Sequence, residues 1–384
     1  MMVKMFNIED CCGCGGCANV CKHNAISMKM DKEGFLYPFV EKDKCVECNL
    51  CEAVCPLLHD KHQKLPLEVF AVKCRDEKVR ALSSSGGFFS VLMNYTIERG
   101  GVIYGAAFDT DFNVVHIRAE NIKECEKFRG AKYVQSTIGL VYRDVLLDLK
   151  NGRQVLFSGT PCQIATLLKM VENKRENLVT CDILCHGVPS PKIWRDYLST
   201  LPEKPSHISF RDKENGWHSS HLCIFSGKTI IVSESHAIND YSQMYFKHLS
   251  LRPSCAKCPY ASMERCGDFS IGDFWGIEKV DTLFDDNKGV SLVFANTQKA
   301  LAIFNDIKEQ LIVKIKSIED SKQPILENPS MLHEDRELFW ICYTWMGFNK
   351  TKTIFLDKYI PNLFVRIEFK IIKKLYKLKR KIGV

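Results

Sequence analysis

Two runs of cysteines near the N-terminus have a spacing that can hold iron–sulfur clusters. Each run reads CxxCxxCxxxC, and the second run begins 34 residues after the first. Cysteines at CxxCxxC spacing can bind three corners of a 4Fe–4S cubane, while the fourth cysteine of the run reaches the other cluster. We therefore predict two clusters with exchanged fourth ligands. The ligands are Cys11, Cys14, Cys17 and Cys55 for one cluster, and Cys45, Cys48, Cys51 and Cys21 for the other.

Zinc is the alternative occupant of these runs. Zinc sites use CxxC pairs more often than two evenly spaced quartets, so the repeat favours iron–sulfur clusters. The chain holds 19 cysteines, nine of them between residues 11 and 55. Such a group in a cytosolic chain indicates metal ligands rather than disulfides. Cys12 has no place in the spacing, and we interpret it as a spare thiol.

Three later cysteines form a further metal-binding pattern. Cys255, Cys258 and Cys266 give a CxxC pair followed by a third cysteine eight residues on. Soft thiolate ligands in a chain that already carries clusters favour a third 4Fe–4S cluster. Zinc and reduced structural thiols are the alternatives. The fourth ligand must come from elsewhere in the chain, and the candidates are first Cys185, then Cys162 or Cys181.

Two loops have the composition of phosphate-binding sites. Residues 83–87 (SSSGG) and 159–163 (GTPCQ) offer hydroxyl groups and small-residue N–H groups at helix starts, which bind anions. Neither is a Walker loop, and no GxGxxG follows a strand, so a standard dinucleotide fingerprint is not indicated. An ordinary helix cap explains each loop taken alone. Cys162 fits a thiolate at a helix start or a small buried apolar residue, and the sequence alone favours the latter.

The hydrophobic pattern places these loops in an α/β domain. The nearly continuous apolar segment 154–160 is typical of a strand in a sheet covered on both faces. Alternating strands and helices indicate an α/β core. The expected strands are residues 68–73, 102–108, 114–119, 154–160 and 178–187, and the expected helices follow residues 83–87, cover 138–150 and begin at Pro161.

Net charge is confined to the C-terminal end. The chain carries a formal charge of +7, and residues 366–384 hold eight basic residues and one acid. The rest of the chain therefore balances to zero, so a general nucleic-acid binder is not indicated. No apolar run is long enough to span a membrane, and the first residues lack the apolar core of a secretory signal. We expect a cytoplasmic protein.

The C-terminal residues predict a basic amphipathic helix. Between residues 360 and 384, apolar residues recur at helical spacing with Lys and Arg between them. Such a helix lies on an anionic membrane surface or docks a partner, or it packs on its own body with a solvated basic face. The sequence leaves these alternatives open. The apolar positions are Ile360, Phe364, Ile367, Ile371, Leu375, Leu378 and Ile382.

Several motifs, taken together and in order, resemble one known family. The coenzyme F420 hydrogenase/dehydrogenase beta-subunit family is the one they resemble, and members with this layout fuse it to an N-terminal two-cluster bacterial-type ferredoxin domain. The resemblance covers residues 5–345, nearly the whole chain. The motifs are SSSGGFFS (83–90), FRGAKYVQS (128–136), LFSGTPCQ (156–163), CHGVPSP (185–191), SFRDKENGW (209–217), and RPSCAKCP with IGDFWG (252–276).

The resemblance implies an iron–sulfur oxidoreductase that binds FAD in a non-Rossmann α/β fold. It also implies that the additional cluster uses Cys255, Cys258, Cys266 and Cys185. The positions that match the family's FAD motifs are Ser84, Ser85, Gly86, Gly87, Lys132, Tyr133, Gln135, Ser136, Thr160, Pro161, Cys162 and Gln163.

Other polar residues are weaker candidates for the same site. Arg129, Arg211 and Arg265 could meet flavin phosphates or an acidic substrate, although ordinary ion pairing explains each one alone. His186 and His218 are candidate proton donors by side-chain type only.

These observations predict an α/β fold, α+β overall, with four parts in order. Residues 1–60 form a two-cluster ferredoxin domain, and residues 68–150 form the N-terminal part of the beta-subunit domain. Residues 151–330 form its C-terminal part, with FAD and a third cluster. Residues 350–384 form the basic amphipathic tail.

The expected function is electron transfer between a one-electron carrier and a two-electron organic substrate through 4Fe–4S clusters and FAD. The first alternative is an electron-transfer subunit that feeds a partner enzyme and has no substrate site of its own. The second is a binding protein whose clusters are structural. Expected partners are a redox protein, namely a ferredoxin or a hydrogenase or dehydrogenase subunit, and a small-molecule substrate. We expect no nucleic acid, and a contact of the tail with the inner face of the membrane is one of the alternatives left open for it.

Overall fold

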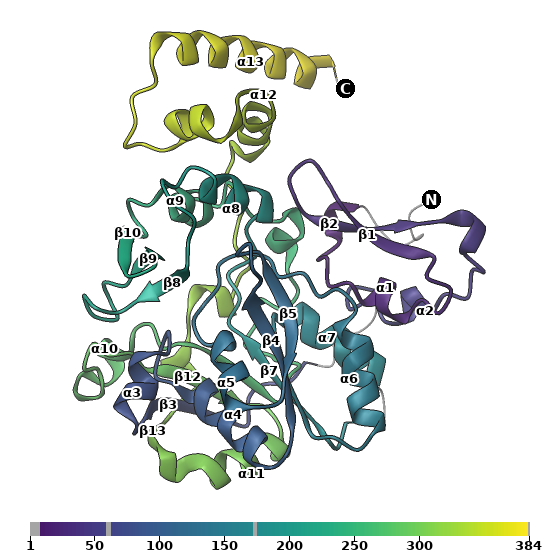
Figure 1. Cartoon of the computed structure of the whole chain (residues 1–384), viewed down its shortest axis with the longest axis vertical. Coiled ribbons are helices and arrows are strands. Elements are labelled where there is room, and N and C mark those ends of the chain that lie inside the picture. The colour runs from purple at the N-terminus through teal and green to yellow at the C-terminus, as the bar shows by residue number, and fades with distance from the viewer. Residues whose placement is uncertain (1–7, 59–62, 172–174, 383–384) are drawn as a thin grey trace.

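An eight-stranded mixed sheet organises the chain (Figure 1). The computed structural model describes residues 8–58, 63–171 and 175–382, so the outer ends of the expected 1–60 and 350–384 segments lie outside it. The strand order is β13–β3–β12–β11–β7–β6–β4–β5. The strands are β3 (Glu68–Cys74), β4 (Val102–Phe108), β5 (Val114–Ala119), β6 (Val155–Gly159), β7 (Leu178–Ile183), β11 (Phe269–Asp273), β12 (Ser291–Ala295) and β13 (Leu311–Lys316).

The centre of this sheet is parallel. Strands β11, β7, β6 and β4 are neighbours and run in one direction. Their carboxyl ends therefore open at one edge, where ligands bind in α/β sheets. The predicted strands 102–108 and 114–119 are confirmed as the antiparallel pair β4 and β5. The predicted strand 178–187 is too long, because β7 ends at Ile183 and the chain turns into a loop at the carboxyl edge.

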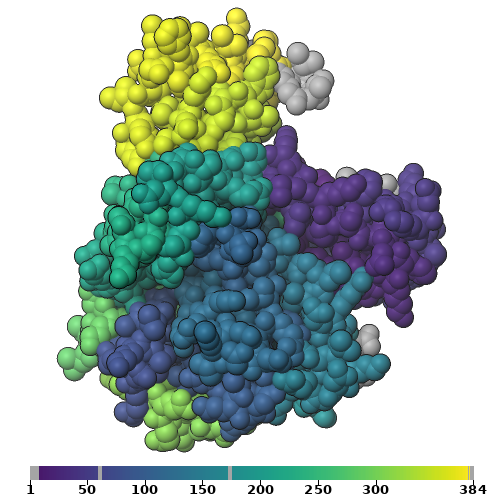
Figure 2. Space-filling view, in the orientation of Figure 1, coloured from purple at the N-terminus to yellow at the C-terminus, as the bar shows by residue number. Residues whose placement is uncertain are grey.

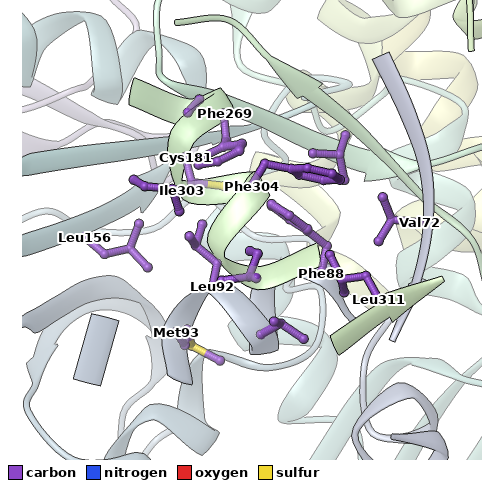
Figure 3. Packing of buried hydrophobic residues seen from close by; sticks show 14 of the residues in the cluster. Val72, Phe88, Leu92, Met93, Leu156, Cys181, Phe269, Ile303, Phe304 and Leu311 are labelled. Carbon is purple, nitrogen blue, oxygen red and sulfur yellow. The ribbon is translucent and has the colours of Figure 1, made fainter. Parts of the chain in front are cut away.

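Helices cover both faces of the sheet. Helices α4 (Phe88–Glu98) and α11 (Gln298–Ile307) pack on one face, and α6 (Val141–Lys150) and α7 (Pro161–Val171) pack on the other. The predicted start of a helix at Pro161 is confirmed. Phe70 of β3 stacks on Phe304 of α11 with ring centroids 4.0 Å apart. Figure 3 shows this core, in which Cys181 of β7 lies among apolar side chains.

A second, smaller sheet and its helices lie beside the first. Strands β8 (His207–Asp212), β9 (His221–Ser226) and β10 (Thr229–Ser235) pair in the order β10–β9–β8. They share an aromatic core with the neighbouring helices around the fully buried Trp194. These helices are α8 (Pro191–Leu198), α9 (Asp240–Phe246) and α12 (Arg336–Phe355). Helix α13 (Leu363–Ile382) packs on α12, and short helices lie at α3 (Glu77–Ala81), α5 (Ile122–Cys125) and α10 (Ile277–Val280).

Residues 8–58 form a separate N-terminal module at the side of the large sheet (Figures 1 and 2). The module contains the hairpin β1 (Ile26–Met30) and β2 (Leu36–Val40), and helices α1 (Gly16–Val20) and α2 (Leu50–Ala53). Arg143 of α6 joins it to the body, because its guanidinium donates to Asn19 O at 2.8 Å and to Cys21 O at 3.0 Å. Helix α1 thus rests on α6 and α7.

The module approaches the body at Gly16 with no space for a side chain, which permits a test of the docking. A Cβ atom at Gly16 would lie 2.3 Å from Thr166 Cγ2 on α7. We therefore expect Gly16→Ala to lower stability by about 1–3 kcal/mol, the usual cost of overpacking. Thr166→Ser removes Cγ2 and keeps the hydroxyl that donates to Cys162 O at 2.8 Å, so the double variant should recover. Thermal unfolding of the four proteins measures this coupling, and an unchanged Gly16→Ala protein would contradict it.

Candidate functional site

Four thiols form a first group in the N-terminal module. Burial raises the pKa of the Cys17 thiol, and the nearby sulfur atoms of the group raise it further. The Gly13 N–H donates to Cys11 Sγ at 3.4 Å, a contact of the kind that stabilises thiolate ligands. The fold thus brings a cysteine of the second run beside those of the first. We call Cys11, Cys14, Cys17 and Cys55 the first thiol group.

A second thiol group lies at the outer side of the module. Cys45 and Cys48 are exposed, whereas Cys21 is buried. Cys21 belongs to the small apolar core of the module, and Cys51 packs against that core. The Ala25 N–H donates to Cys21 Sγ at 3.3 Å. Cys48 interacts electrostatically with Cys51, and Cys45 joins this set by its spacing in the sequence. We call Cys21, Cys45, Cys48 and Cys51 the second thiol group, and its two exposed members reach solvent.

A third thiol group lies where the loops after β6 and β7 meet residues 255–266. Cys185 and Cys258 both interact electrostatically with Cys162, at the start of α7. Cys266 Sγ lies 3.7 Å from Pro161 O, and the Val188 N–H donates to Cys255 Sγ at 3.4 Å. The group therefore has five members, one more than a cubane needs. They are Cys162, Cys185, Cys255, Cys258 and Cys266.

The structure separates the three sequence candidates for the fourth ligand of this group. Cys185 and Cys162 both belong to it, so either can complete the set. Cys181 instead packs in the core formed by α4 and α11 (Figure 3) and is not a ligand candidate. The reason is the alternation of side chains along β7, which turns Cys181 toward α4 and α11.

Cys12, which the spacing left without a partner, lies between the first and third thiol groups. The thiol of Cys12 lies beside those of Cys14 and Cys162, and the proton that it shares with them raises the pKa of Cys12 well above its ordinary value. Cys162 Sγ also lies 3.2 Å from Thr160 Oγ1. Since Cys12 also lines the cavity described below, it is placed at the junction of two thiol groups and the ligand space. No pattern in the sequence indicates this position.

A single buried arginine, Arg252, lies between the first and the third thiol groups. Arg252 is fully buried, and its guanidinium donates to Cys11 O at 2.7 Å, to Leu36 O at 2.9 Å and to Gln135 Oε1 at 3.0 Å. Gln135 in turn donates through Nε2 to Cys12 O at 3.0 Å. Sequence reasoning missed Arg252, because its partners are 117 to 241 residues away in the chain.

A cavity of about 1160 Å³ opens at the carboxyl edge of the parallel strands. Its wall includes four cysteines of the third thiol group, all but Cys266. It also includes eleven of the twelve residues that the resemblance implies for FAD, which are Ser84, Ser85, Gly87, Lys132, Tyr133, Gln135, Ser136, Thr160, Pro161, Cys162 and Gln163.

Gly86, the twelfth residue, lies outside the cavity wall and fixes the loop behind it. Its N–H donates to Ser291 Oγ at 3.0 Å, and a Cβ atom there would lie 2.1 Å from Val72 O. On its cavity side the same loop is joined to residues 128–136, since the Ala131 N–H donates to Ser84 Oγ at 2.6 Å. The 83–87 and 128–136 segments therefore form one continuous wall.

Buried hydrogen bonds position the residues after β6. His116 Nδ1 lies 2.8 Å from Ser136 Oγ, and His116 Nε2 lies 3.0 Å from Ser158 O. Gln163 donates through Nε2 to Ser136 Oγ at 3.1 Å. Burial lowers the pKa of His116 to about 4, so its imidazole is neutral at pH 7.

Lys132 is a cation on the cavity wall without an acidic partner. Its Nζ donates to the carbonyl oxygens of Arg129 at 3.1 Å and Gly130 at 3.0 Å, and within the described part of the chain no carboxylate pairs with it. Burial lowers the pKa of Lys132 to about 7. The starts of α4 and α7 border the same cavity, so two helix N-termini and the Lys132 amine, which is protonated below about pH 7, border one space.

The other polar candidates divide into wall and core residues. Arg129 and Arg211 line the cavity, and Arg211 also pairs with Asp273 at 3.2 Å. Arg265 is buried in an ion pair with Asp182 and does not line the cavity, so the family-derived expectation of an anion contact there is not supported. His186 and His218 both line the cavity.

Two family models match parts of the chain. Residues 152–321 match the model for the C-terminal region of the coenzyme F420 hydrogenase/dehydrogenase beta subunit, and residues 10–57 match the 4Fe-4S dicluster domain. No curated protein matches the chain. Among solved structures, the F420-reducing NiFe hydrogenase complex from Methanosarcina barkeri, studied as a xenon derivative, is 16% identical with a TM-score of 0.48. That match covers 79% of this chain and 98% of the other.

Iron content tests the assignment of the third thiol group. Under this assignment the anaerobically purified chain holds about 12 iron atoms, and Cys255→Ala/Cys258→Ala should hold about eight, because the first two groups stay intact. Cys181→Ala is the matched control and should keep all its iron. Single Cys162→Ala and Cys185→Ala variants identify the fourth ligand as the one whose loss removes four irons. Equal iron in the wild type and the double variant would refute a third cluster.

The buried imidazole of His116 predicts a pH-dependent stability. Its pKa is about 4 in the folded state and about 6.5 when unfolded, so the unfolded chain binds the extra proton between these values. Stability should therefore fall as pH falls from 6.5 toward 4, by about 3 kcal/mol at most. His116→Gln should weaken this dependence in urea unfolding at pH 7 and pH 4.5. The exposed control His207→Gln should retain it, and a slope unchanged in His116→Gln would contradict the assignment.

Proposed function

Because residues 152–321 belong to the coenzyme F420 hydrogenase/dehydrogenase beta-subunit family and residues 10–57 form a 4Fe-4S dicluster domain, we propose that this iron–sulfur protein is also an FAD-dependent oxidoreductase. It moves electrons between a one-electron carrier and a two-electron organic substrate. The observation that carries the proposal is that one cavity is lined both by cysteines and by the residues implied for FAD. Cys162, Cys185, Cys255 and Cys258 line the same cavity as the residues implied for FAD.

The thiol groups fit iron–sulfur clusters in their donor chemistry. Backbone N–H groups point at the sulfur atoms of Cys11, Cys21 and Cys255, an arrangement that stabilises anionic sulfur. Burial raises the pKa of the Cys255 thiol to about 12. A thiol of this kind becomes a stable thiolate only when a metal binds it. Bound clusters supply one-electron transfer.

The three thiol groups succeed one another from the surface inward. Cys45 and Cys48 of the second group are exposed, the first group lies between the module and the body, and the third borders the cavity. Cys12 and Arg252 bridge the first and third groups. Electrons from a soluble carrier can therefore enter at the exposed end, where Val46 presents an apolar contact that is 58% exposed.

The cavity fits a flavin dinucleotide in size and lining. Its volume of about 1160 Å³ is slightly above the range of about 300–1,000 Å³ that is usual for small-molecule sites, as a large cofactor requires. Lys132 and the start of α4 can hold the diphosphate, through a cationic side chain and the N–H groups of a helix start. The start of α7 offers fewer donors, because Pro161 has no N–H and the Thr160 N–H donates to Gln163 Oε1 at 2.9 Å. Tyr133 supplies an aromatic face, held by Tyr245 and Phe246 with ring centroids 5.5 and 6.1 Å away. Bound FAD exchanges single electrons with clusters and electron pairs with organic substrates.

The solvent side of the cavity offers a place for the substrate. His218 lines the cavity, is exposed, and its Nε2 lies 2.6 Å from Asp285 Oδ2. Asp285 fixes the ring, so His218 can hold or donate a proton at the opening. The alternative is a subunit that passes electrons to a partner enzyme. Substrate-dependent reoxidation of the reduced flavin by the isolated chain supports the first function, and reoxidation only by a partner protein supports the second.

Flavin content of variants tests the site directly. Lys132→Met should weaken FAD binding roughly 10- to 100-fold, the usual value of a charged hydrogen bond. Gly86→Ala should also lose flavin, because its Cβ displaces the loop from Val72 O. The control Lys123→Met changes an exposed lysine outside the cavity wall and should bind normally. FAD is measured by titration and by identification of the flavin that heat releases.

The pH dependence of the same titration sharpens the test. Lys132 is protonated below about pH 7, so the affinity of the wild type for FAD should fall as pH rises above 7. The affinity of Lys132→Met should not follow this trend. If Lys132→Met binds FAD as tightly as the wild type at every pH, the flavin is not held here.

A further inference from the structure

Helix α13 presents three different faces along its length. One face packs on α12, where Val365 and Ile372 are 6% and 3% exposed. Phe369 and Tyr376 extend this docked face, and Tyr376 donates its hydroxyl to Glu337 Oε2 of α12 at 2.9 Å. The helix is therefore fixed to the body in one rotational setting. The alternatives that the sequence left open can now be judged from the two faces that remain.

An apolar stripe runs along α13 away from the docked face. Its residues recur every three or four positions, the spacing of one side of a helix. Their exposed fractions range from 46% for Leu378 to 82% for Phe364. Packing against α12 thus leaves a continuous apolar surface in water, which marks an interaction site. The stripe consists of Phe364, Ile367, Ile371, Leu375 and Leu378.

The third face of α13 is basic. It carries six exposed cations on the described part of the helix. Glu368, the one acidic residue of α13, forms an ion pair with Lys350 of α12 at 2.8 Å. The uncompensated charge therefore borders the apolar stripe. The basic face consists of Arg366, Lys370, Lys373, Lys374, Lys377 and Arg380.

The position of α13 leaves both faces accessible to a flat surface. Figure 1 shows α13 across one end of the molecule, with α12 between it and the body. Trp345 of α12 is 69% exposed and follows Ile341, which packs in the α12–α13 contact, by one turn. Tryptophan is enriched at membrane–water interfaces. In the described part of the chain, no helix has the length and apolarity needed to cross a bilayer.

We propose that α13 binds the surface of an anionic lipid bilayer, with the apolar stripe in the headgroup–acyl boundary and the basic face on the lipid phosphates. A stripe of this kind flanked by Lys and Arg is the pattern of an interfacial helix. A second copy of the chain is a poorer occupant, because apposed stripes would bring two sets of six cations together. The proposal is independent of the redox chemistry.

Vesicle flotation of the cluster-loaded full chain tests this surface. The probes are vesicles of phosphatidylcholine alone and of equal parts phosphatidylcholine and phosphatidylglycerol. We expect binding to the anionic vesicles only, and weaker binding as salt rises. Equal binding to both vesicle types, or binding to neither, overturns the proposal.

Two triple variants separate the two faces. Phe364→Ser/Ile371→Ser/Leu375→Ser should lower vesicle affinity at least tenfold. Lys370→Gln/Lys374→Gln/Lys377→Gln should lower it roughly 100-fold, at about fivefold per charge. The matched control Leu283→Ser/Lys279→Gln changes exposed residues on the body and should bind normally. Iron content and circular dichroism verify the fold of each protein.

Sedimentation of the same proteins identifies a competing occupant. A wild-type dimer that becomes a monomer in the stripe variant would assign the stripe to a second copy and overturn the proposal. Stripe and charge variants that float as well as the wild type would overturn it too. Iron-dependent electron transfer should be unchanged in all variants, so a failure of the lipid assay leaves the redox function a separate question.

Discussion

The buried guanidinium of Arg252 is the contact on which the arrangement of the first and third thiol groups depends. It is fully buried, and within the described residues no carboxylate neutralises it. A buried charge of this kind is costly unless a counter-charge lies nearby. Cys14 and Cys162 can supply the counter-charge, because the contact with Cys12 lowers the pKa of each thiol and the nearby guanidinium lowers it further. Docking of the module and the approach of the first and third thiol groups therefore depend on the same cation. The thiols that interact with it are Cys11, Cys14, Cys162 and Cys255.

This dependence explains why so little side-chain bulk separates the module from the sheet. Gly13 packs on Arg252 with no room for a Cβ, since the nearest guanidinium atom would be 2.6 Å away. Gly16 packs equally closely on Thr166 of α7. Because Cys162 lies in the first turn of α7, these two approaches place the first thiol group beside the third. The first and third thiol groups are thus spaced by close backbone packing rather than by flexible side chains.

The sequence predicts what depends on local spacing and misses what depends on distant contacts. Cysteine spacing indicated the metal-binding runs, and alternation and helix starts located β4, β5 and α7. Arg252 could not be found in this way, because its carbonyl acceptor at Cys11 is 241 residues distant. The contact of Cys12 with Cys162 could not be found either, since Cys162 belongs to the body, at the start of α7. Local sequence spacing determines which cysteines can form a group, whereas tertiary packing determines which thiol groups lie next to one another.

Charge gives the molecule a polarity that the clusters would increase. The chain apart from its last residues is neutral, and each oxidised cubane with four thiolates adds about −2. The loaded body is then anionic, while α13 keeps its exposed basic face at one end of the molecule (Figure 1). An anionic surface would therefore repel the body and attract α13. That orientation leaves Cys45 and Cys48, on the module at the side of the sheet, open to a soluble carrier.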